Sequence, residues 1–493
     1  MKFIKKYQHL ITACLLFLII SFIYLYKVVP SYNYDSDFGR DINDILQITK
    51  GKISLIGPKL SFGGIHAGPY YYYLFAPVLK IFHLNPQSMI VFNAIIFLII
   101  LLVSFFVILK SKLKNKYLWL LGISWIFVSP FMIYSGRGPG NAFSYLALLF
   151  ALLIIFPQIL NKNKLFLGLI YGFFIGVIIN FHLINLLLFA PLILITFVFY
   201  LFKKDWKKIL LTFFISIGIL ISFAPLLIFE ARHNFVQIKN TFIDKSYIVF
   251  VDNKNLVDPL PTSSNRFLNF WLLQKHFTVW SQISFLVLFL ITIILLIINW
   301  KKCDHPTKIY IISSLFAFLI LVFVAKAQVA IHYFFPFILA IQVSLILLFS
   351  QLSIKISSKI ILLFLLIIFI KFPKNFYQPA IRDINEYQNF TNKLVNSDLF
   401  KNIDPKINLF CARETPVAVL GWEYRYFLEL NGYKILAPTL FNEANQLLII
   451  QENRNSDNVN SLKSWEIDQF GPKELINSTS LDGRNIFLFK KIE

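Results

Sequence analysis

The sequence has few charged residues and few cysteines for its length. Only 15% of its 493 residues are Asp, Glu, Lys or Arg, whereas 57% are hydrophobic. This composition excludes a disordered chain and argues against a single soluble globule, because a soluble protein needs a more charged surface. The three cysteines, Cys14, Cys303 and Cys411, show neither pairing nor metal-ligand spacing. Neither a disulfide framework nor a thiolate metal site is therefore indicated.

Acidic residues are also scarce. The chain has 25 of them against 47 basic residues, a formal net charge of +22. Such an excess occurs in nucleic-acid-binding proteins, but in a chain this apolar it indicates cytoplasmic loops that carry Lys and Arg. The sequence also lacks a Gly-rich phosphate loop and an internal repeat. We expect no nucleic-acid partner and no nucleotide pocket.

Long apolar runs are abundant. A helix needs about 20 mostly apolar residues to cross a bilayer. The first run follows three lysines, lacks a small-residue cleavage site and is followed by further runs, so it predicts a membrane helix and not a signal peptide. We expect an α-helical polytopic membrane protein with about 11 transmembrane helices, near residues 9–29, 86–109, 117–135, 142–160, 165–180, 181–202, 209–229, 279–299, 309–325, 332–350 and 357–373.

The distribution of Lys and Arg predicts the orientation. If the N-terminus is cytoplasmic, the inner segments hold 18 Lys and Arg in 45 residues, and the outer loops hold 13 in 118 residues. This contrast follows the positive-inside rule. The odd number of spans then places the C-terminal tail outside a plasma membrane. Two outer loops, 30–84 and 230–277, are long enough to be functional.

The tail differs in composition from the rest of the chain. We predict a transmembrane domain over 1–373, and a connecting helix with a small extracytoplasmic α/β domain over 374–493. A helix is expected at 415–430, because Asn431-Gly432 is a typical stop signal. Asp482-Gly483 is a hairpin signal. Strands are expected at 406–412, 433–436, 446–451 and 485–490.

The first outer loop opens with an acidic segment, Tyr34-Asp35-Ser36-Asp37-Phe38-Gly39-Arg40-Asp41-Ile42-Asn43-Asp44. If it is helical, Asp37, Arg40, Asp41 and Asp44 share one face. One interpretation is a solvated helix start, since Asp favours N-caps. The other is a general base close to the membrane surface.

The same loop continues with two Gly-rich turns around His66 and then four tyrosines, Tyr70 to Tyr73. Glycine turns allow backbone to approach a ligand, which makes His66 a candidate binding residue. The tyrosines also fit an aromatic belt at the headgroup level.

Polar residues recur at the outer ends of the predicted spans. Singly, each is explained as a helix cap or a snorkelling side chain. Together they place a His, Arg, Lys, Asn or Glu in every outer turn, and ionisable residues near membrane depth are functional candidates. The pattern predicts an anionic substrate at the outer leaflet, bound among Arg137, Asn141, Asn180, His182, Glu230, Arg232, His233, Lys326, His332 and Tyr333.

Five motifs in this order resemble the GT-C superfamily of polytopic glycosyltransferases, in particular the group of protein O-mannosyltransferases and the lipid A aminoarabinose transferase. The resemblance covers about 1–373. It rests on the acidic motif Tyr34–Asp41, the Pro-aromatic segment His66–Tyr73, Arg137, the helix end Pro225–Glu230, and Lys326 with His332-Tyr333-Phe334-Phe335-Pro336.

The resemblance implies a GT-C-like fold and a polyprenyl-phosphate-linked sugar as donor, with a glycan, lipid or protein hydroxyl as acceptor. A carboxylate then serves as base in an inverting transfer, with Asp37 as our choice and Asp35 as the competing candidate. Glu230, His66 and His233 are candidates for a divalent metal. The substrate-binding candidates are Arg40, Asp41, His66, Tyr70, Arg137, Asn141, His182, Glu230, Arg232, Lys326, His332 and Tyr333.

A transporter or flippase of lipid-linked saccharides is the alternative. It also needs many spans and a cationic site. Transporters tend to place ionisable residues near the midplane and to contain inverted repeats, whereas the polar residues here cluster at the outer ends of the spans.

Overall fold

The computed structural model describes most of the chain. The described residues are 2–60, 64–113, 115–243, 283–324, 331–352, 354–370, 372–412, 420–452, 459, 462 and 464–492. Most of the long predicted outer loop 230–277, and Lys326 of the predicted site, lie outside them.

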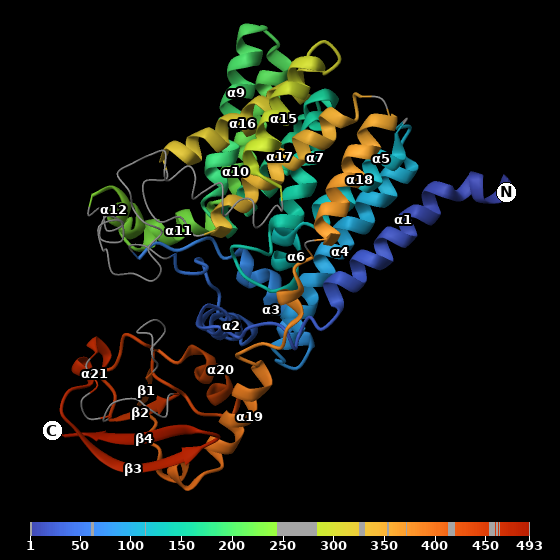
Figure 1. Ribbon diagram of the computed structural model, residues 1–493. Coiled ribbons are helices and arrows are strands. Elements are labelled where there is room, and N and C mark those ends of the chain that lie inside the picture. Colours follow the sequence, from blue (N-terminus) through green and yellow to red (C-terminus); the bar gives the residue numbers. More distant parts are fainter. Residues whose placement is uncertain are drawn as a thin grey trace. The chain divides into compact units, whose positions relative to one another are not determined.

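The chain forms two compact units (Figure 1). The helical unit comprises residues 1–28, 53–78 and 88–377, and the sheet unit comprises 29–52, 79–87 and 378–493. The sequence predicted a division at residue 373 alone. The structure instead groups the acidic segment of the first outer loop with the C-terminal tail, through contacts that span most of the sequence.

The helical unit contains the apolar helices. Each of the eleven predicted segments overlaps one described helix or one bent helix pair. The elements are α1 (Lys2–Leu25), α3 (Tyr70–Ile81), α4 (Gln87–Lys110), α5 (Lys116–Phe127), α6 (Pro130–Arg137), α7 (Leu146–Lys162), α8 (Leu165–Phe181), α9 (Asn185–Phe202), α10 (Trp206–Ser222), α11 (Ala224–Arg232), α12 (Val236–Phe242), α15 (Phe285–Ile298), α16 (His305–Val324), η1 (Ile331–Phe334), α17 (Phe335–Phe349), α18 (Ile354–Ile370) and η2 (Lys374–Tyr377).

Several of these helices are long and apolar enough to cross a membrane. Among the described residues four meet the criteria of length and composition, and up to six do if each bent pair is one span. The pairs α5–α6 and α10–α11 bend by 63° and 50°, and each second helix has a proline in its first turn, where proline's fixed φ is tolerated. The protein is thus a multi-pass membrane protein, and the number of eleven spans stays a prediction.

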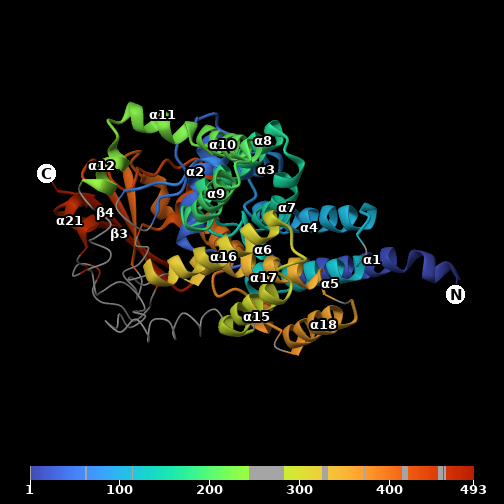
Figure 2. The ribbon, with the colours of Figure 1, turned by 90° about the horizontal axis from the view of Figure 1, so that it is seen from above.

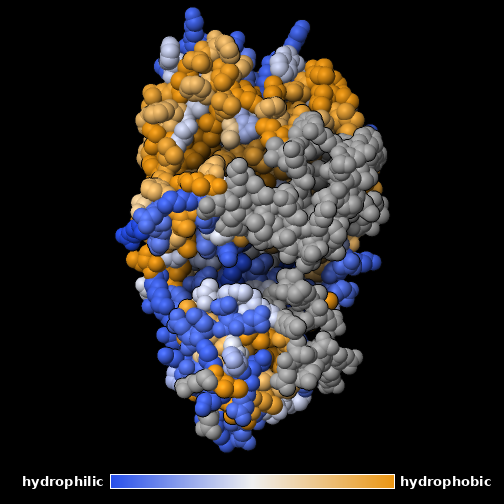
Figure 3. All heavy atoms as spheres, turned by 90° about the vertical axis from the view of Figure 1, so that its left-hand side faces the viewer, coloured by the Kyte–Doolittle hydropathy of each residue, from blue (hydrophilic) through white to orange (hydrophobic). Residues whose placement is uncertain are grey.

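Helix α17 forms the centre of the helical unit. All fifteen of its residues are buried, and it contacts α5, α7, α15 and α16, as the second view illustrates (Figure 2). Its Gln342 amide nitrogen donates to the Ser129 hydroxyl at 3.0 Å, which gives one polar atom in the apolar interior a partner. Where Figure 3 shows the surface of the helical unit in colour, that surface is mostly hydrophobic, as a lipid-facing surface requires.

Glycines set the close packing of α8 against α10. Gly168, Gly172 and Gly176 repeat every four residues on α8 and therefore share one helix face. A Cβ on Gly172 would lie 2.0 Å from the Ile215 carbonyl oxygen, and one on Gly218 would lie 2.1 Å from the Leu169 carbonyl oxygen. The two backbones are thus in direct contact.

We expect Gly172→Ala to destabilise the protein by about 1–3 kcal/mol, because the added methyl meets backbone that cannot move without separating the helices. Gly122→Ala is the matched control, since its Cβ would meet only the Ile346 side chain, at 3.0 Å. Thermal unfolding in detergent measures both variants. Equal unfolding temperatures for the two would contradict the packing argument.

The sheet unit is an α/β structure, as predicted. Its sheet has the order β1-β2-β4-β3, with β1 (Ile407–Ala412) parallel to β2 (Gln446–Gln451), and with β4 (Arg484–Lys491) antiparallel to both β2 and β3 (Lys473–Leu481). A core that includes Phe410, Leu447 and Phe489 packs on this sheet. The remaining elements are α2 (Ser36–Thr49), α19 (Ile384–Val395), η3 (Asp398–Asn402), α20 (Trp422–Leu430) and α21 (Trp465–Phe470).

The local predictions for the tail have mixed outcomes. The strands at 406–412, 446–451 and 485–490 are confirmed. The hairpin is also confirmed, because Asp482 and Gly483 have φ values of +46° and +79° and join β3 to β4, as a tight primed turn requires. The predicted strand at 433–436 is wrong: the segment makes a single bridge, from Ile435 to Ile407.

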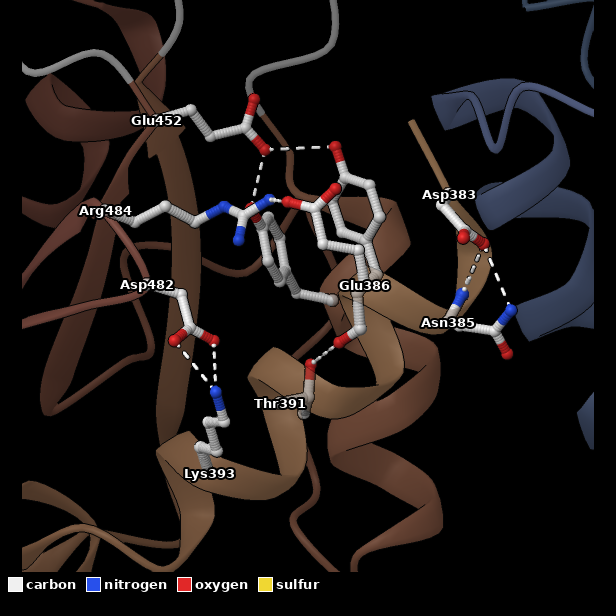
Figure 4. Close-up of polar contacts among 10 residues, drawn as sticks. Asp383, Asn385, Glu386, Thr391, Lys393, Glu452, Asp482 and Arg484 are labelled. Atoms are coloured by element: carbon white, nitrogen blue, oxygen red, sulfur yellow. Dashed lines mark hydrogen bonds and ion pairs between the residues drawn. The ribbon is translucent and has the colours of Figure 1, made fainter. Parts of the chain in front are cut away.

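A polar cluster ties α19 to the sheet (Figure 4). Arg484 at the start of β4 donates to the Glu386 carboxylate at 2.5 Å, and its guanidinium lies over the Phe390 ring at 4.7 Å. Glu452, just after β2, accepts from the hydroxyl of Tyr387 on α19 at 3.3 Å and from that of Tyr424 on α20 at 2.6 Å. These contacts fix α19, and with it the chain that enters α19.

Candidate active site

The acidic segment forms an amphipathic helix, α2. Its apolar residues Phe38, Ile42, Ile45 and Leu46 are buried in the sheet unit. Asp35, Asp37 and Asp44 are exposed, whereas Asp41 is buried. Asp35 is the N-cap: its carboxylate accepts from the backbone N–H of Phe38 at 2.8 Å. The helix-cap interpretation of the sequence therefore holds for this residue.

Arg40 joins the next two carboxylates. It donates to Asp41 from Nε at 2.9 Å and from Nη2 at 2.8 Å, and to Asp37 from Nη1 at 2.9 Å. The Asp41 side chain is only 3% exposed, whereas that of Asp37 is 82% exposed. The buried Asp41 thus accepts from Nε and Nη2 of the Arg40 guanidinium, and the exposed Asp37 accepts from Nη1. The shared helix face of Asp37, Arg40 and Asp41 is as predicted.

Asp35 and Asp41 both have perturbed pKa values. Desolvation by the surrounding protein raises the pKa of Asp35 from 3.8 to about 6, although the residue itself is exposed at the surface. Burial raises the pKa of Asp41 to about 7, against the opposing charge and hydrogen bonds of Arg40. A carboxylate with a pKa near 6 is matched to proton abstraction near neutral pH.

Residues of the tail surround the start of α2, which the sequence did not indicate. Tyr34 donates its backbone N–H to the Arg382 carbonyl at 3.0 Å and its hydroxyl to the Glu423 carbonyl at 3.3 Å. A Cβ on Gly39 would lie 2.9 Å from the Glu423 nitrogen, so α2 and the first turn of α20 meet backbone to backbone. Glu423 is fully buried, and its carboxylate lies 3.6 Å from the Arg382 guanidinium.

Three predicted residues come together in the helical unit. The ring of His182, at the end of α8, lies 5.5 Å from that of His332 and 4.9 Å from that of Tyr333, both on η1. His332 and Tyr333 are themselves 4.6 Å apart. Asn141 lies beside this cluster, because its amide donates to the Phe181 carbonyl at 3.3 Å. The residues of three predicted outer turns thus converge, as expected.

A hairpin places His66 and Tyr70. Ala67 N–H donates to the Pro58 carbonyl at 2.9 Å, and Lys59 pairs with His66. The His66 backbone N–H donates to Gln237 at 2.5 Å, and the Tyr70 hydroxyl donates to the Ser222 carbonyl at 2.7 Å. These contacts dock His66 and Tyr70 onto the first turn of α12 and the C-terminal end of α10.

Glu230 and its neighbours form no metal-ligand group. The buried carboxylate of Glu230 accepts from the backbone N–H of Ile238 at 3.2 Å, as a cap of α12 does. The His233 ring stacks on Phe229, and Arg232 is exposed. Within the described ranges no three His, Cys, Asp or Glu side chains are placed to hold a metal ion, so Glu230, His66 and His233 are not brought together.

Arg137 has a different position from the one expected of a phosphate ligand. It donates to the carbonyls of Ile23 at 2.9 Å and Tyr26 at 2.9 Å, and its guanidinium lies over the Tyr377 ring at 4.2 Å. It also bonds the carbonyls of Tyr24, Lys27 and Phe376. These contacts tie the C-terminal end of α1 to the segment that follows α18.

A comparison with solved structures gives the fold. The chain is similar to ArnT from Cupriavidus metallidurans, both in the apo state and bound to undecaprenyl phosphate, with a TM-score of 0.60, 9% sequence identity and 97% of each chain covered. The chain has the GT-C fold. The predicted fold class, a helical GT-C-like membrane protein with a small C-terminal α/β domain, is thereby confirmed. No protein-family model and no curated protein matches the sequence.

Proposed function

We propose that this GT-C protein is an integral membrane glycosyltransferase, which moves a sugar from a polyprenyl-phosphate-linked donor to an acceptor hydroxyl on the extracytoplasmic face. The observation that carries the proposal is the likeness over 97% of the chain to a structure of ArnT bound to undecaprenyl phosphate. The lipid of that structure is the kind of donor carrier that the sequence resemblance implied. The acidic helix α2 of the sheet unit supplies a candidate base, and the His and Tyr residues that converge within the helical unit supply candidate donor contacts.

The transfer reaction requires a base for the acceptor hydroxyl and groups that stabilise the negative charge on the leaving phosphate. The acceptor oxygen attacks the anomeric carbon while its proton passes to a carboxylate, and the bond from that carbon to the phosphate oxygen breaks, so that the lipid phosphate leaves with the electron pair. Attack opposite the leaving group inverts the anomeric centre.

We propose Asp35, the competing candidate of the sequence analysis, as the base in place of Asp37. The raised pKa of Asp35 and its exposed position support this role. Asp37 is less suited, because its carboxylate is already engaged by the guanidinium of Arg40 at 2.9 Å. Arg40 and Asp41 are proposed to hold α2 and orient the sugar.

The cluster of His182, His332 and Tyr333 is proposed to bind the donor. Imidazole and phenol groups can donate hydrogen bonds to phosphate or sugar oxygens as negative charge develops on the leaving group. Asn141 beside this cluster remains a proposed substrate contact, as do His66, Tyr70, Glu230 and Arg232 elsewhere in the helical unit. We no longer propose Arg137 as a phosphate ligand, because its donors already bond backbone carbonyls.

The test uses the purified full-length protein with a panel of radiolabelled polyprenyl-phosphate sugars and mixed acceptors. Release of sugar from the lipid, at a rate proportional to enzyme and lost on heat inactivation, is the expected result. Tight donor binding without turnover would favour the transporter, which is the alternative that the span number also allows. Absence of both binding and turnover across the panel would overturn the proposal.

A further inference from the structure

The segment that precedes α19 runs alongside the residues that lead into the proposed base. Asn33 accepts from the backbone N–H of Ile381 at 3.0 Å, and Tyr34 N–H donates to the Arg382 carbonyl at 3.0 Å. Residue 382 is therefore paired with the two residues that come directly before Asp35. This pairing joins the first outer loop to the tail within the sheet unit.

The position of Arg382 is fixed from its other side as well. Asp383 is the N-cap of α19 and accepts from the backbone N–H of Asn385 at 2.9 Å (Figure 4). Because a capped helix start has a defined backbone, the residue just before the cap is held too. The Arg382 side chain is 35% exposed, so it combines a fixed backbone with access to solvent.

Glu423 is the partner that orients the Arg382 guanidinium. Its side chain is fully buried, and the two charged groups are 3.6 Å apart. The backbone of Glu423 packs against Gly39, whose N–H donates to the Asp35 carbonyl at 2.9 Å. Asp35, Gly39 and Glu423 thus form one packed group.

We infer that Arg382, oriented by the buried carboxylate of Glu423, is a positioning residue that supplies the counter-charge for Asp35. This inference rests on the proposed function, because it gives Asp35 the role of base. It assigns the C-terminal tail a part in the transfer reaction, because residues 382 and 423 contribute charges near Asp35 at the start of α2.

The charges that face Asp35 come from three elements. Tyr34 and Asp37 belong to its own segment, Arg382 to the segment before α19, and Glu423 to α20. Asp37 and Glu423 raise the pKa of Asp35, and Arg382 lowers it. Removal of Arg382 and removal of the Glu423 charge should therefore act in opposite directions.

The experiment measures the pH profile of kcat/KM for sugar transfer. Arg382→Gln should move the acid limb up by about one pH unit, equal to about a tenfold extra loss at pH 5, since a nearby cation favours the carboxylate. Glu423→Gln should move the limb down. Arg382→Lys should restore most of the profile, and Lys393→Gln, which removes an exposed cation paired with Asp482 in the same unit, should leave it unchanged.

A titration without turnover separates this inference from the proposed function. Infrared spectra of protein with ¹³C-labelled aspartate, corrected with Asp35→Asn, report the protonation of Asp35 directly. Opposite shifts for Arg382→Gln and Glu423→Gln support the inference even if no sugar is transferred. No shift, or shifts of the same sign in both variants, would overturn it. If Glu423→Gln fails to fold, the Arg382→Gln and Arg382→Lys pair decides.

Discussion

Asp35→Asn is expected to lower kcat for sugar transfer by about 10²–10⁴-fold, the usual contribution of a general base. The amide keeps the oxygen that accepts from the Phe38 N–H, and Asn is as good an N-cap as Asp, so α2 should still begin at Ser36. The loss would then be chemical and not structural. In the wild type, kcat/KM should fall as the pH drops through about 6, because protonated Asp35 cannot take the acceptor proton.

The chain offers a matched control for this variant. Asp205 is the N-cap of α10 and accepts from the Lys208 N–H, so Asp205→Asn makes the same chemical change at the same kind of position without touching the acidic loop. We expect unchanged turnover for Asp205→Asn, and less than a tenfold loss for Asp37→Asn. Full activity of Asp35→Asn together with an inactive Asp37→Asn would return the role of base to Asp37.

The local elements were predictable because their signals are local. Apolar runs predicted the helices, so that the segment near 86–109 is α4, Gln87–Lys110. Asp482-Gly483 predicted the hairpin, since few residue pairs accept two positive φ values. The span count stays a prediction, because helices such as α7 and α8 are shorter than a full crossing requires.

The long-range associations were not predictable in the same way. The bond between the Tyr34 hydroxyl and the Glu423 carbonyl joins residues that are 389 positions apart. Nothing in the composition of either segment indicates its partner, because the pairing depends on shape, such as the room that Gly39 leaves for α20. The sequence therefore identified the acidic loop as a candidate site and missed Arg382 and Glu423 beside it.

Arg137 shows the same limit for a single residue. An Arg at an outer helix end fits a phosphate ligand as well as a structural role, and the sequence cannot distinguish these. In the structure Arg137 is 5% exposed. It donates to five backbone carbonyls, four near the C-terminal end of α1 and one in the segment after α18. The last carbonyls of a helix have no partner within it, and a cation there also favours the helix dipole.

Arg137→Gln should therefore act mainly on stability. We expect a loss of about 1–3 kcal/mol, because removal of the guanidinium leaves buried carbonyl acceptors without their donors, seen as a lower unfolding temperature in detergent. Arg137→Lys should recover only part of it, because one ammonium with three donors cannot reach all five carbonyls. The protein that remains folded should bind the donor with an unchanged Kd. A normal unfolding temperature combined with lost donor binding would instead assign Arg137 to the substrate phosphate. If Arg137 only joined α1 to the chain after α18, a variant with intact helices would still bind the donor.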